Sequence, residues 1–256
     1  MISIILLTKN EEDRVGEYWG WLKEVKTINE IVVVDDNSTD KTLAKLKSVV
    51  PKNINLVIIK NTLTSFSEQR KLALSKTKNK WVLWLDADET PSPQLLKFLK
   101  NFKPSKYDYA FSFPRWDYFL GQRLCHGENT SQSFTRLFLK TYGSFQGVVH
   151  ETWLPARSPS FLNLPILHYP HRNFYHFINK INFYSTLRAQ QLYSDKISTN
   201  LFQIIFYPLA KFVQNYIIRL GFLDSTPGII MALTMSFHSF LVRSKLWHMY
   251  QPSSTA

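Results

Sequence analysis

Two aspartates one residue apart, Asp86 and Asp88, directly follow the apolar run from Trp81 to Leu85. Two carboxylates in a tight turn repel each other unless a positive group lies between them, and a divalent cation that carries substrate phosphates is the usual solution. Solvated loop acids, one of which caps the next helix, give the same pattern. The spacing alone therefore leaves a divalent-cation site as one of two open interpretations.

A buried strand must deliver these acids to a binding site. The run from Trp81 to Leu85 lacks polar alternation, which is typical of a central parallel strand covered on both faces. Thr90 and Pro91 fit a helix N-cap followed by proline at the first helical position. Asp86 and Asp88 then lie at the carboxyl end of the strand, and open α/β sheets bind ligands at that edge.

Three earlier apolar runs alternate with helical patterns and indicate further strands, at Ile2 to Leu7, Ile31 to Val34 and Leu56 to Ile59. Ser65 and Glu68 form a capping box for the helix that follows the third strand. Four strands joined by helices predict a largely parallel sheet whose strands end at one edge. The polar residues after three of these strands should therefore converge in an electronegative crevice that favours a cation or ligand: Thr8 and Glu11, Asp35 and Asp36, Asp86 and Asp88.

Two further features can serve this crevice. Arg70 is a possible counter-charge for a diphosphate or nucleotide, although an exposed helix arginine is the more common case. His150 and Glu151 follow the strand-like run from Phe145 to Val149, where they can supply a metal ligand and a general base, although a lone His-Glu pair is more often structural. The glycines form neither G-x-x-x-x-G-K nor G-x-G-x-x-G, which excludes P-loop nucleotide hydrolases and standard dinucleotide dehydrogenases.

The charge is uneven along the 256 residues. Up to Ala156 there are 22 basic and 17 acidic residues, whereas from Arg157 onward there are 9 basic and 2 acidic residues among many aromatic ones. Such a segment suits nucleic acid, an anionic membrane surface, or packed helices with a solvated basic face. Within it, the uncharged run from Ser225 to Val242 contains proline, glycine, histidine and hydroxyl residues, so we expect a core or interfacial helix rather than a membrane span.

Cysteine and histidine usage adds little to the site. Cys125 is the only cysteine, so an intrachain disulfide is impossible and a reducing compartment fits. The short apolar N-terminal run leads at once into charged residues, unlike a signal peptide. His168, His171 and His176 lack a zinc-binding spacing, and we expect structural or interfacial roles for them.

Seven short motifs, taken in order, resemble those of the family-two inverting glycosyltransferases with the GT-A fold, and within them the bacterial lipopolysaccharide core β-1,4-glucosyltransferases. The motifs are Thr8-Lys9-Asn10-Glu11, Val34-Asp35-Asp36-Asn37-Ser38-Thr39-Asp40, Ser67-Glu68-Gln69-Arg70, Trp84-Leu85-Asp86-Ala87-Asp88-Glu89, Arg136-Leu137-Phe138, Val149-His150-Glu151 and Gly221-Phe222-Leu223-Asp224.

The resemblance implies a Rossmann-type α/β/α sandwich with a mostly parallel central sheet at residues 1–156, which binds the nucleotide sugar and carries catalysis. Residues 157–256 would form a helical, aromatic-rich region on the membrane and acceptor side. The implied enzyme is an inverting, metal-dependent hexosyltransferase. It would move a hexose, glucose favoured, from a UDP-sugar to a lipid-linked saccharide such as lipopolysaccharide core. It would work in the cytoplasm, peripherally bound to the inner face of the cell membrane, with no nucleic-acid partner.

The resemblance also implies site residues. The metal ion, Mg²⁺ or Mn²⁺, would be held mainly by Asp88, with Asp86 and His150. From the residues themselves, and not from the resemblance, we predict that Glu151 takes the proton from the acceptor hydroxyl and that His150 orients it or helps to bind the metal. The nucleotide sugar would contact Thr8, Asn10, Glu11, Asp35, Asp36, Arg70, Asp86, Ala87 and Arg136.

Two departures from the family pattern concern the acceptor. The segment from Glu128 to Ser133 lacks an expected aspartate, and Ser225 follows Asp224 where glycine is common.

Two other classes of function stay open at this point. Asp86 to Thr90 fits the D-x-D-x-T pattern of aspartyl-phosphate phosphohydrolases, in which the first aspartate is the nucleophile. Those enzymes need a later acidic pair for magnesium, and after Glu89 no two acids lie within four residues of each other. A non-catalytic membrane or nucleic-acid adaptor would use the basic segment alone.

Replacement of the candidate base tests the catalytic assignment. The base of a one-step inversion must lie across the sugar from the metal acids, and Glu151 is the acid that follows a strand-like run beside a histidine. Glu151→Gln keeps its size and removes its basicity, so donor binding should survive while turnover falls by roughly two to four orders of magnitude. Near-normal turnover of this variant would mean that another acid is the base, with Asp117 or Glu128 as the next candidates.

Overall fold

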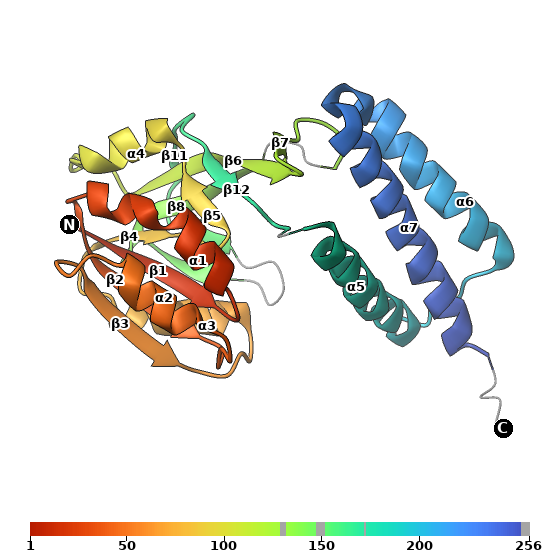
Figure 1. Cartoon of the computed structure of the whole chain (residues 1–256), viewed down its shortest axis with the longest axis horizontal. Helices are drawn as coiled ribbons and strands as arrows, with labels where there is room; N and C mark the ends of the chain where they lie inside the picture. The colour runs from red at the N-terminus through yellow and green to blue at the C-terminus, as the bar shows by residue number, and fades with distance from the viewer. Residues whose placement is uncertain (129–131, 147–151, 172, 252–256) are drawn as a thin grey trace. The chain divides into compact units, whose positions relative to one another are not determined.

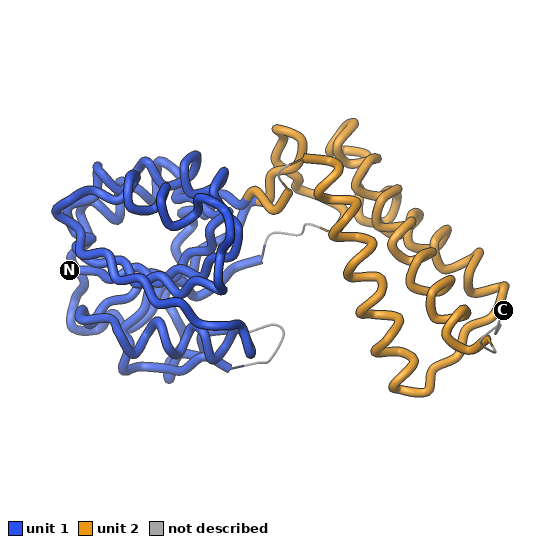
Figure 2. Tube along the Cα trace, turned by 60° about the horizontal axis from the view of Figure 1, so that its bottom comes forward, with its two compact units in different colours: residues 1–116, 132–168 blue, residues 117–131, 169–256 orange. Residues whose placement is uncertain are grey.

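The computed structural model describes residues 1–128, 132–146, 152–171 and 173–251. The chain forms two compact units (Figure 2). Unit 1 comprises Met1–Trp116 and Gln132–His168, and unit 2 comprises Asp117–Ser131 and Tyr169–Ala256. The sheet unit thus runs on to His168, past the boundary expected at Ala156, because two short strands after that point join its sheet.

A mixed sheet forms the centre of unit 1 (Figure 1). Its parallel half has the order β3-β2-β1-β4, with all neighbours parallel. β8 and β6 continue the sheet in antiparallel fashion, followed by β12 and β5. The strands are β1 (Ile2–Thr8), β2 (Ile28–Asp35), β3 (Asn55–Lys60), β4 (Trp81–Trp84), β5 (Glu89–Pro91), β6 (Ala110–Phe119), β8 (Gln132–Leu139) and β12 (Ile166–His168).

Three small strand pairs complete the β structure. β7 (Gln122–Arg123) pairs with the end of β6, and β11 (Ser160–Phe161) pairs with its start. β9 (Gly143–Gln146) and β10 (Thr152–Pro155) form a separate two-stranded sheet.

Alternate residues of the central strands face two different cores, as expected for a sheet covered on both sides. Ile4 and Leu6 of β1 belong to a cluster with side chains of α1, α2 and α4. Ile5, between them, belongs to a second cluster with α3 and the β9–β10 pair. The helices of this unit are α1 (Glu12–Tyr18), the 3-10 helix η1 (Gly20–Glu24), α2 (Thr42–Val49), α3 (Phe66–Lys76) and α4 (Pro93–Lys100). The predicted α/β/α sandwich is confirmed.

Local capping agrees with the sequence at one helix and not at another. Ser65 caps α3, since its side chain accepts a hydrogen bond from the Glu68 N–H at 3.2 Å. The prediction of a cap at Thr90 and Pro91 was wrong, because both residues pair with β12 as part of β5. Ser92 caps α4 instead, with Pro93 at the first helical position, so the same cap-and-proline pattern operates two residues later.

Unit 2 is built from long helices. α5 (Phe174–Ser194) and α6 (Leu201–Phe212) both contact α7 (Ser225–Met249). α6 passes through Pro208 without ending there and continues as the π-helix η2 (Val213–Ile218). The Pro208 carbonyl oxygen accepts a hydrogen bond from Ser236 of α7 at 2.6 Å, which holds this part of α6 against its neighbour.

One helical stretch among the described residues, Gly221–Met249, is long and apolar enough to cross a membrane by length and composition. It consists of the 3-10 helix η3 (Gly221–Asp224) followed by α7. Only 22% of its most apolar window is buried within the protein. The expectation that it is a core or interfacial helix stays a prediction.

Ser225 at the start of α7 has a φ of 54°, a left-handed value that favours glycine. Ser225→Gly should therefore raise the free energy of unfolding by about 1 kcal/mol, measured by denaturant titration. Ser239→Gly, inside the same helix, is the matched control and should lower it by about 0.5 kcal/mol. A loss of stability in Ser225→Gly would contradict the assignment of strain to this residue.

Candidate functional site

The ends of β1 and β2 are bonded together at the carboxyl edge of the sheet. Thr8 and Asp35 are register partners, and the Thr8 hydroxyl donates to Asp35 Oδ1 at 3.0 Å. Asp35 is fully buried and also accepts from the backbone N–H of Ser38 at 2.9 Å and from its hydroxyl at 2.5 Å. Asp35 therefore shapes the turn after β2 rather than pointing into solvent.

The loops that follow these two strands interlock. Asn10 has a φ of 55°, a conformation that asparagine tolerates better than most residues. Its side-chain oxygen accepts from the Thr39 N–H at 2.8 Å, and its own N–H donates to Ser38 at 3.0 Å. The Glu11 N–H donates to the Thr42 hydroxyl at 2.7 Å. The two loops thus form one polar wall of the edge.

Asp36 lies in the same wall. Its N–H donates to the carbonyl oxygen of Thr8, and its carboxylate accepts from Lys9 at 2.6 Å and from the Leu63 N–H at 3.0 Å. The hydrogen bond from Lys9 is the main cause that lowers the pKa of Asp36 below its ordinary value. Asp36 is therefore ionised and fixed near neutral pH.

Asp86, after β4, is held by two arginines. It accepts from Arg70 at 3.1 Å and from Arg136 at 3.4 Å, and the Trp84 indole N–H donates to it at 3.2 Å. Both guanidinium groups also stack on the Trp84 ring, at 3.9 Å and 4.0 Å from its centre. Burial alone would raise the pKa of Asp86, but the two arginine charges and these hydrogen bonds hold it well below its ordinary value.

Glu89 and Arg136 form a buried ion pair beneath this cluster. Their closest atoms, Oε1 and Nη2, lie 2.6 Å apart, and the two side chains are 0% and 3% exposed. Glu89 also accepts from the Asp86 N–H at 3.0 Å, which fixes the turn between the two aspartates. Burial raises the pKa of Glu89 above its ordinary value even though Arg136 opposes the shift.

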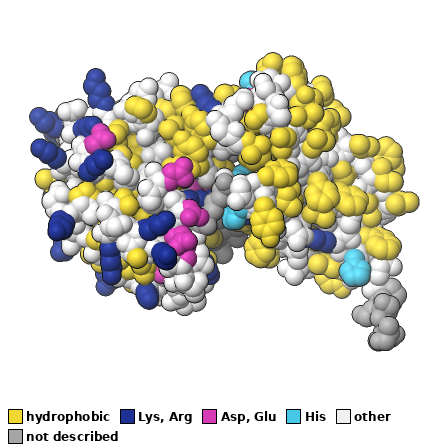
Figure 3. All heavy atoms as spheres, viewed as in Figure 1, with side chains coloured by type: hydrophobic (Ala, Val, Ile, Leu, Met, Phe, Trp, Pro, Cys, Tyr) yellow, Lys and Arg dark blue, Asp and Glu magenta, His cyan; other side chains and the backbone are white. Residues whose placement is uncertain are grey.

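Asp88 faces a different set of partners. Its Oδ2 atom lies 3.2 Å from Arg14 of α1 and 3.4 Å from His168 Nε2 of β12. Arg14 also contacts Glu11 at 3.2 Å. Burial would raise the pKa of Asp88, but the hydrogen bond and charge of His168 and the charge of Arg14 lower it overall. In Figure 3, acidic side chains gather along the edge of unit 1 at which β1 ends.

Both aspartates are contacted by arginine, but Asp88 also has a histidine beside it, and this makes it the better candidate for a divalent cation. Carboxylate oxygen and imidazole nitrogen are both ligands for Mn²⁺, and Asp88 with His168 offers one of each. Asp86 is engaged by Arg70, Arg136 and Trp84. Within residues 1–128, 132–146, 152–171 and 173–251, no group of three acidic, histidine or cysteine side chains could hold a metal ion. A bound ion would need donors from the substrate as well.

The structure thus brings together most of the residues singled out from the sequence. Ala87, by contrast, is buried in the core. His150 and Glu151 lie outside the described residues. Sequence reasoning missed Arg14 and His168. Arg14 could have been found from its position three residues after Glu11, because this spacing places both side chains on the same side of a helix. His168 ends a strand of three residues, opposite Glu89, and so short a strand leaves no periodic pattern.

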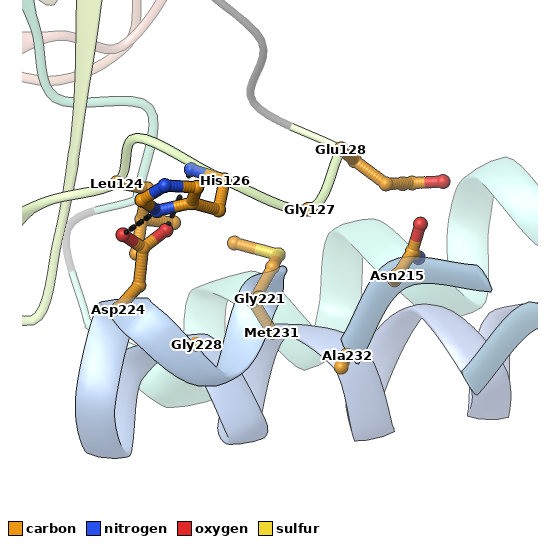
Figure 4. A pocket seen from close by; sticks show the side chains of 10 residues that line it. All are labelled: Leu124, His126, Gly127, Glu128, Asn215, Gly221, Asp224, Gly228, Met231 and Ala232. Carbon is orange, nitrogen blue, oxygen red and sulfur yellow. Dashed lines mark hydrogen bonds and ion pairs between the residues drawn. The ribbon is translucent and has the colours of Figure 1, made fainter. Parts of the chain in front are cut away.

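The Gly221–Asp224 motif builds a joint inside unit 2 (Figure 4). The Asp224 carboxylate is buried and accepts from the backbone N–H groups of Cys125 and His126 at 3.0 Å and 2.8 Å, while its other oxygen lies 2.9 Å from His126 Nδ1. A Cβ atom on Gly228 would collide with the carbonyl oxygen of Gly221. The motif therefore serves to hold the loop before Glu128 against the helices.

Comparison with known sequences points to one family. A family model described as Glycosyl transferase family 2 matches residues 3–154. An uncharacterized glycosyltransferase of Rickettsia typhi is 27% identical over 266 residues, covering 96% of this chain and 86% of the relative. The lipopolysaccharide core biosynthesis glycosyltransferase LpsC of Rhizobium meliloti is 24% identical over 255 residues, covering 96% and 92%.

Solved structures share the fold at low identity. S. aureus TarS 1–349 in complex with UDP-GlcNAc has a TM-score of 0.52 and 17% identity, covering 94% of this chain and 81% of that one. The mannosyltransferase PcManGT of Pyrobaculum calidifontis in complex with GDP-Man and Mn²⁺ has a TM-score of 0.51 and 13% identity, covering 98% and 88%. These neighbours confirm the predicted fold class.

The buried Glu89–Arg136 pair gives a test of how the site is held. Arg136→Met leaves a buried carboxylate without its partner, so the free energy of unfolding should fall by about 3–5 kcal/mol in denaturant titration. Adding Glu89→Gln to the same chain removes the unpaired charge and should restore part of this loss. Lys97→Met, on the exposed face of α4, is the control and should change stability by less than about 0.5 kcal/mol. Equal losses in the single and double variants would contradict the pairing.

Proposed function

Because the chain belongs to glycosyl transferase family 2, we propose that it is an inverting hexosyltransferase that uses a UDP-sugar donor, with glucose as the favoured sugar. The acceptor is a lipid-linked saccharide such as lipopolysaccharide core. The observation that carries the proposal is that three groups of polar residues lie at one edge of the sheet. They are the hydrogen-bonded Thr8 and Asp35, Asp86 with its arginines, and Asp88 with His168.

In this proposal, each part of the edge has a task. The loops that carry Asn10, Glu11 and Asp36 surround the nucleotide. Arg70 and Arg136 set the charge and position of Asp86 beside the donor. Arginine is suited to this work because its rigid guanidinium group can bind a carboxylate and stack on an aromatic ring at once.

The divalent cation is proposed at Asp88 with His168, and it would neutralise the diphosphate leaving group. Mg²⁺ and Mn²⁺ are commonly bound by one or two carboxylates together with substrate phosphates, which fits the small number of protein donors. Arg14 holds the Asp88 carboxylate at 3.2 Å from the side of α1, so the carboxylate is oriented before any ligand arrives. The predicted metal roles of Asp86 and His150 are not needed for this arrangement.

The proton of the acceptor hydroxyl goes to Glu151 in this proposal, with His150 as its neighbour. Inversion in one step requires the hydroxyl to attack opposite the departing diphosphate, so the metal acids cannot also be the base.

The acceptor class rests on the similarity to LpsC, which covers nearly the whole of both chains, and on the basic, aromatic composition from Arg157 onward. The proposed location is therefore the cytoplasmic face of the cell membrane, by peripheral association. The phosphohydrolase alternative is disfavoured, because its nucleophile would be Asp86, whose oxygens are held by Arg70, Arg136 and Trp84.

Hydrolysis of a panel of nucleotide sugars in the absence of acceptor tests the reaction class. UDP-glucose should be consumed fastest, and release of UDP should stop with chelator. Release of inorganic phosphate from simple phosphate esters, with no attack on any nucleotide sugar, would instead support the phosphohydrolase.

The cation site is tested by calorimetric titration of UDP-glucose with and without Mn²⁺. Asp88→Asn and His168→Ala should each weaken the Mn²⁺-dependent binding by roughly 10- to 100-fold. Asp195→Asn and His248→Ala, the same changes in unit 2, are the controls and should bind as the unchanged protein does. Donor binding that is equally tight with chelator would contradict the proposed ion.

A further inference from the structure

Helix α6 has no buried residue, although it is mostly apolar. Its large side chains, with those of η2, recur at steps of three and four residues along one side of the helix, which is the spacing of a continuous stripe. Each is between 45% and 71% exposed. We call these residues the α6 stripe: Leu201, Phe202, Ile205, Phe206, Leu209, Val213 and Ile217.

The charges around the α6 stripe lie where a lipid surface would place them. Between Leu201 and Ile218 the only charged residue is Lys211, which is paired with Glu128 of the same unit. Lys196 precedes the stripe and Arg219 follows it, and both are exposed. An uncharged aromatic and aliphatic face with a cation at each end matches the boundary between hydrocarbon and anionic headgroups.

A hollow in the surface opens beside the stripe. It has a volume of about 340 Å³ and is lined by Asn200, Phe202, Gln203, Phe206, Tyr207 and Ala210. The Phe202 and Phe206 rings stack with their centres 4.1 Å apart, which gives the hollow a rigid aromatic wall. The lining is mixed, since Asn200, Gln203 and Tyr207 carry polar groups and Arg243 lies 4.3 Å from the centre of the Tyr207 ring. Apolar chain segments, such as those of lipids, suit the wall formed by Phe202 and Phe206.

Exposed apolar side chains also continue onto α7, at Leu233, Phe237 and Phe240. In the view of Figure 3 hydrophobic side chains gather over unit 2. Large exposed apolar side chains on two helices that contact each other indicate an interaction site, because they are costly to leave in water.

We propose that the α6 stripe inserts into the apolar boundary of a lipid bilayer, with α6 lying in the plane of the membrane. Burial of the stripe, rather than attraction between charges, supplies most of the binding. The inference rests on the proposed function in one respect, since a lipid-linked acceptor requires the enzyme to work at a bilayer.

Flotation of the full chain with vesicles tests the proposal. Vesicles of phosphatidylcholine alone and vesicles with added phosphatidylglycerol are compared at low and high salt. Binding should persist on neutral vesicles and at high salt. Ile205→Asn with Leu209→Asn leaves the charge unchanged and should weaken binding to both kinds of vesicle at least about tenfold, because two apolar side chains lose their favourable transfer.

The matched control replaces two exposed apolar residues of unit 1 with asparagine. Leu154 and Phe161 are 47% and 58% exposed, close to the 48% and 56% of Ile205 and Leu209. Leu154→Asn with Phe161→Asn should bind vesicles as the unchanged protein does. Circular dichroism and donor hydrolysis in solution, without vesicles, show that each variant is folded.

Two outcomes would overturn the proposal. Loss of binding at high salt or in Lys196→Gln with Arg219→Gln, with no effect of the Asn pair, would mean that charge alone holds the protein. A dimer in vesicle-free solution that the Asn pair dissociates, without vesicle binding, would make the stripe an interface between two copies. In both cases hydrolysis of UDP-glucose is unaffected, whereas absence of hydrolysis in every variant would count against the proposed function.

Discussion

The attraction between buried arginines and the acids at the end of β4 is the constraint on which unit 1 depends. Asp86, Asp88 and Glu89 lie within four residues, and without positive partners their charges would repel one another in a buried turn. Arg14, Arg70 and Arg136 arrive from α1, α3 and β8 to supply those charges. The turn therefore depends on the packing of α1 and α3 against the sheet and on the pairing of β8 with β4.

The sequence was most informative where one physical rule acts over a whole segment. Continuous apolar runs predicted the four parallel strands, and the direction of those strands predicted that Thr8, Asp35 and Asp86 would meet at one edge. Both features are observed. The fold class could be predicted because strands covered on both faces, such as Ile2–Thr8, carry a strong signal in apolar residues alone.

Sequence reasoning failed where tertiary pairing outweighs a local pattern. Thr90 and Pro91 look like the start of a helix, but the pairing of β5 with β12 draws them into the sheet. His168 reaches Asp88 for the same reason, through a partner strand that is distant in sequence. The uncharged face of α6 could not be predicted from the number of charges after Arg157. That number shows an excess of lysine and arginine but does not show on which side of a helix they lie.

Unit 2 is made from two separate pieces of the chain, and Asp224 ties one to the other through the N–H groups of Cys125 and His126. A graft of the C-terminal helices alone onto another sheet domain would leave the Asp224 carboxylate buried without the N–H groups that donate to it. The loop of the new sheet domain would not be matched to the grafted helices. Exchange of this region between enzymes, in the laboratory or in evolution, must therefore transfer both pieces together, and recombination at a single crossover point is penalised.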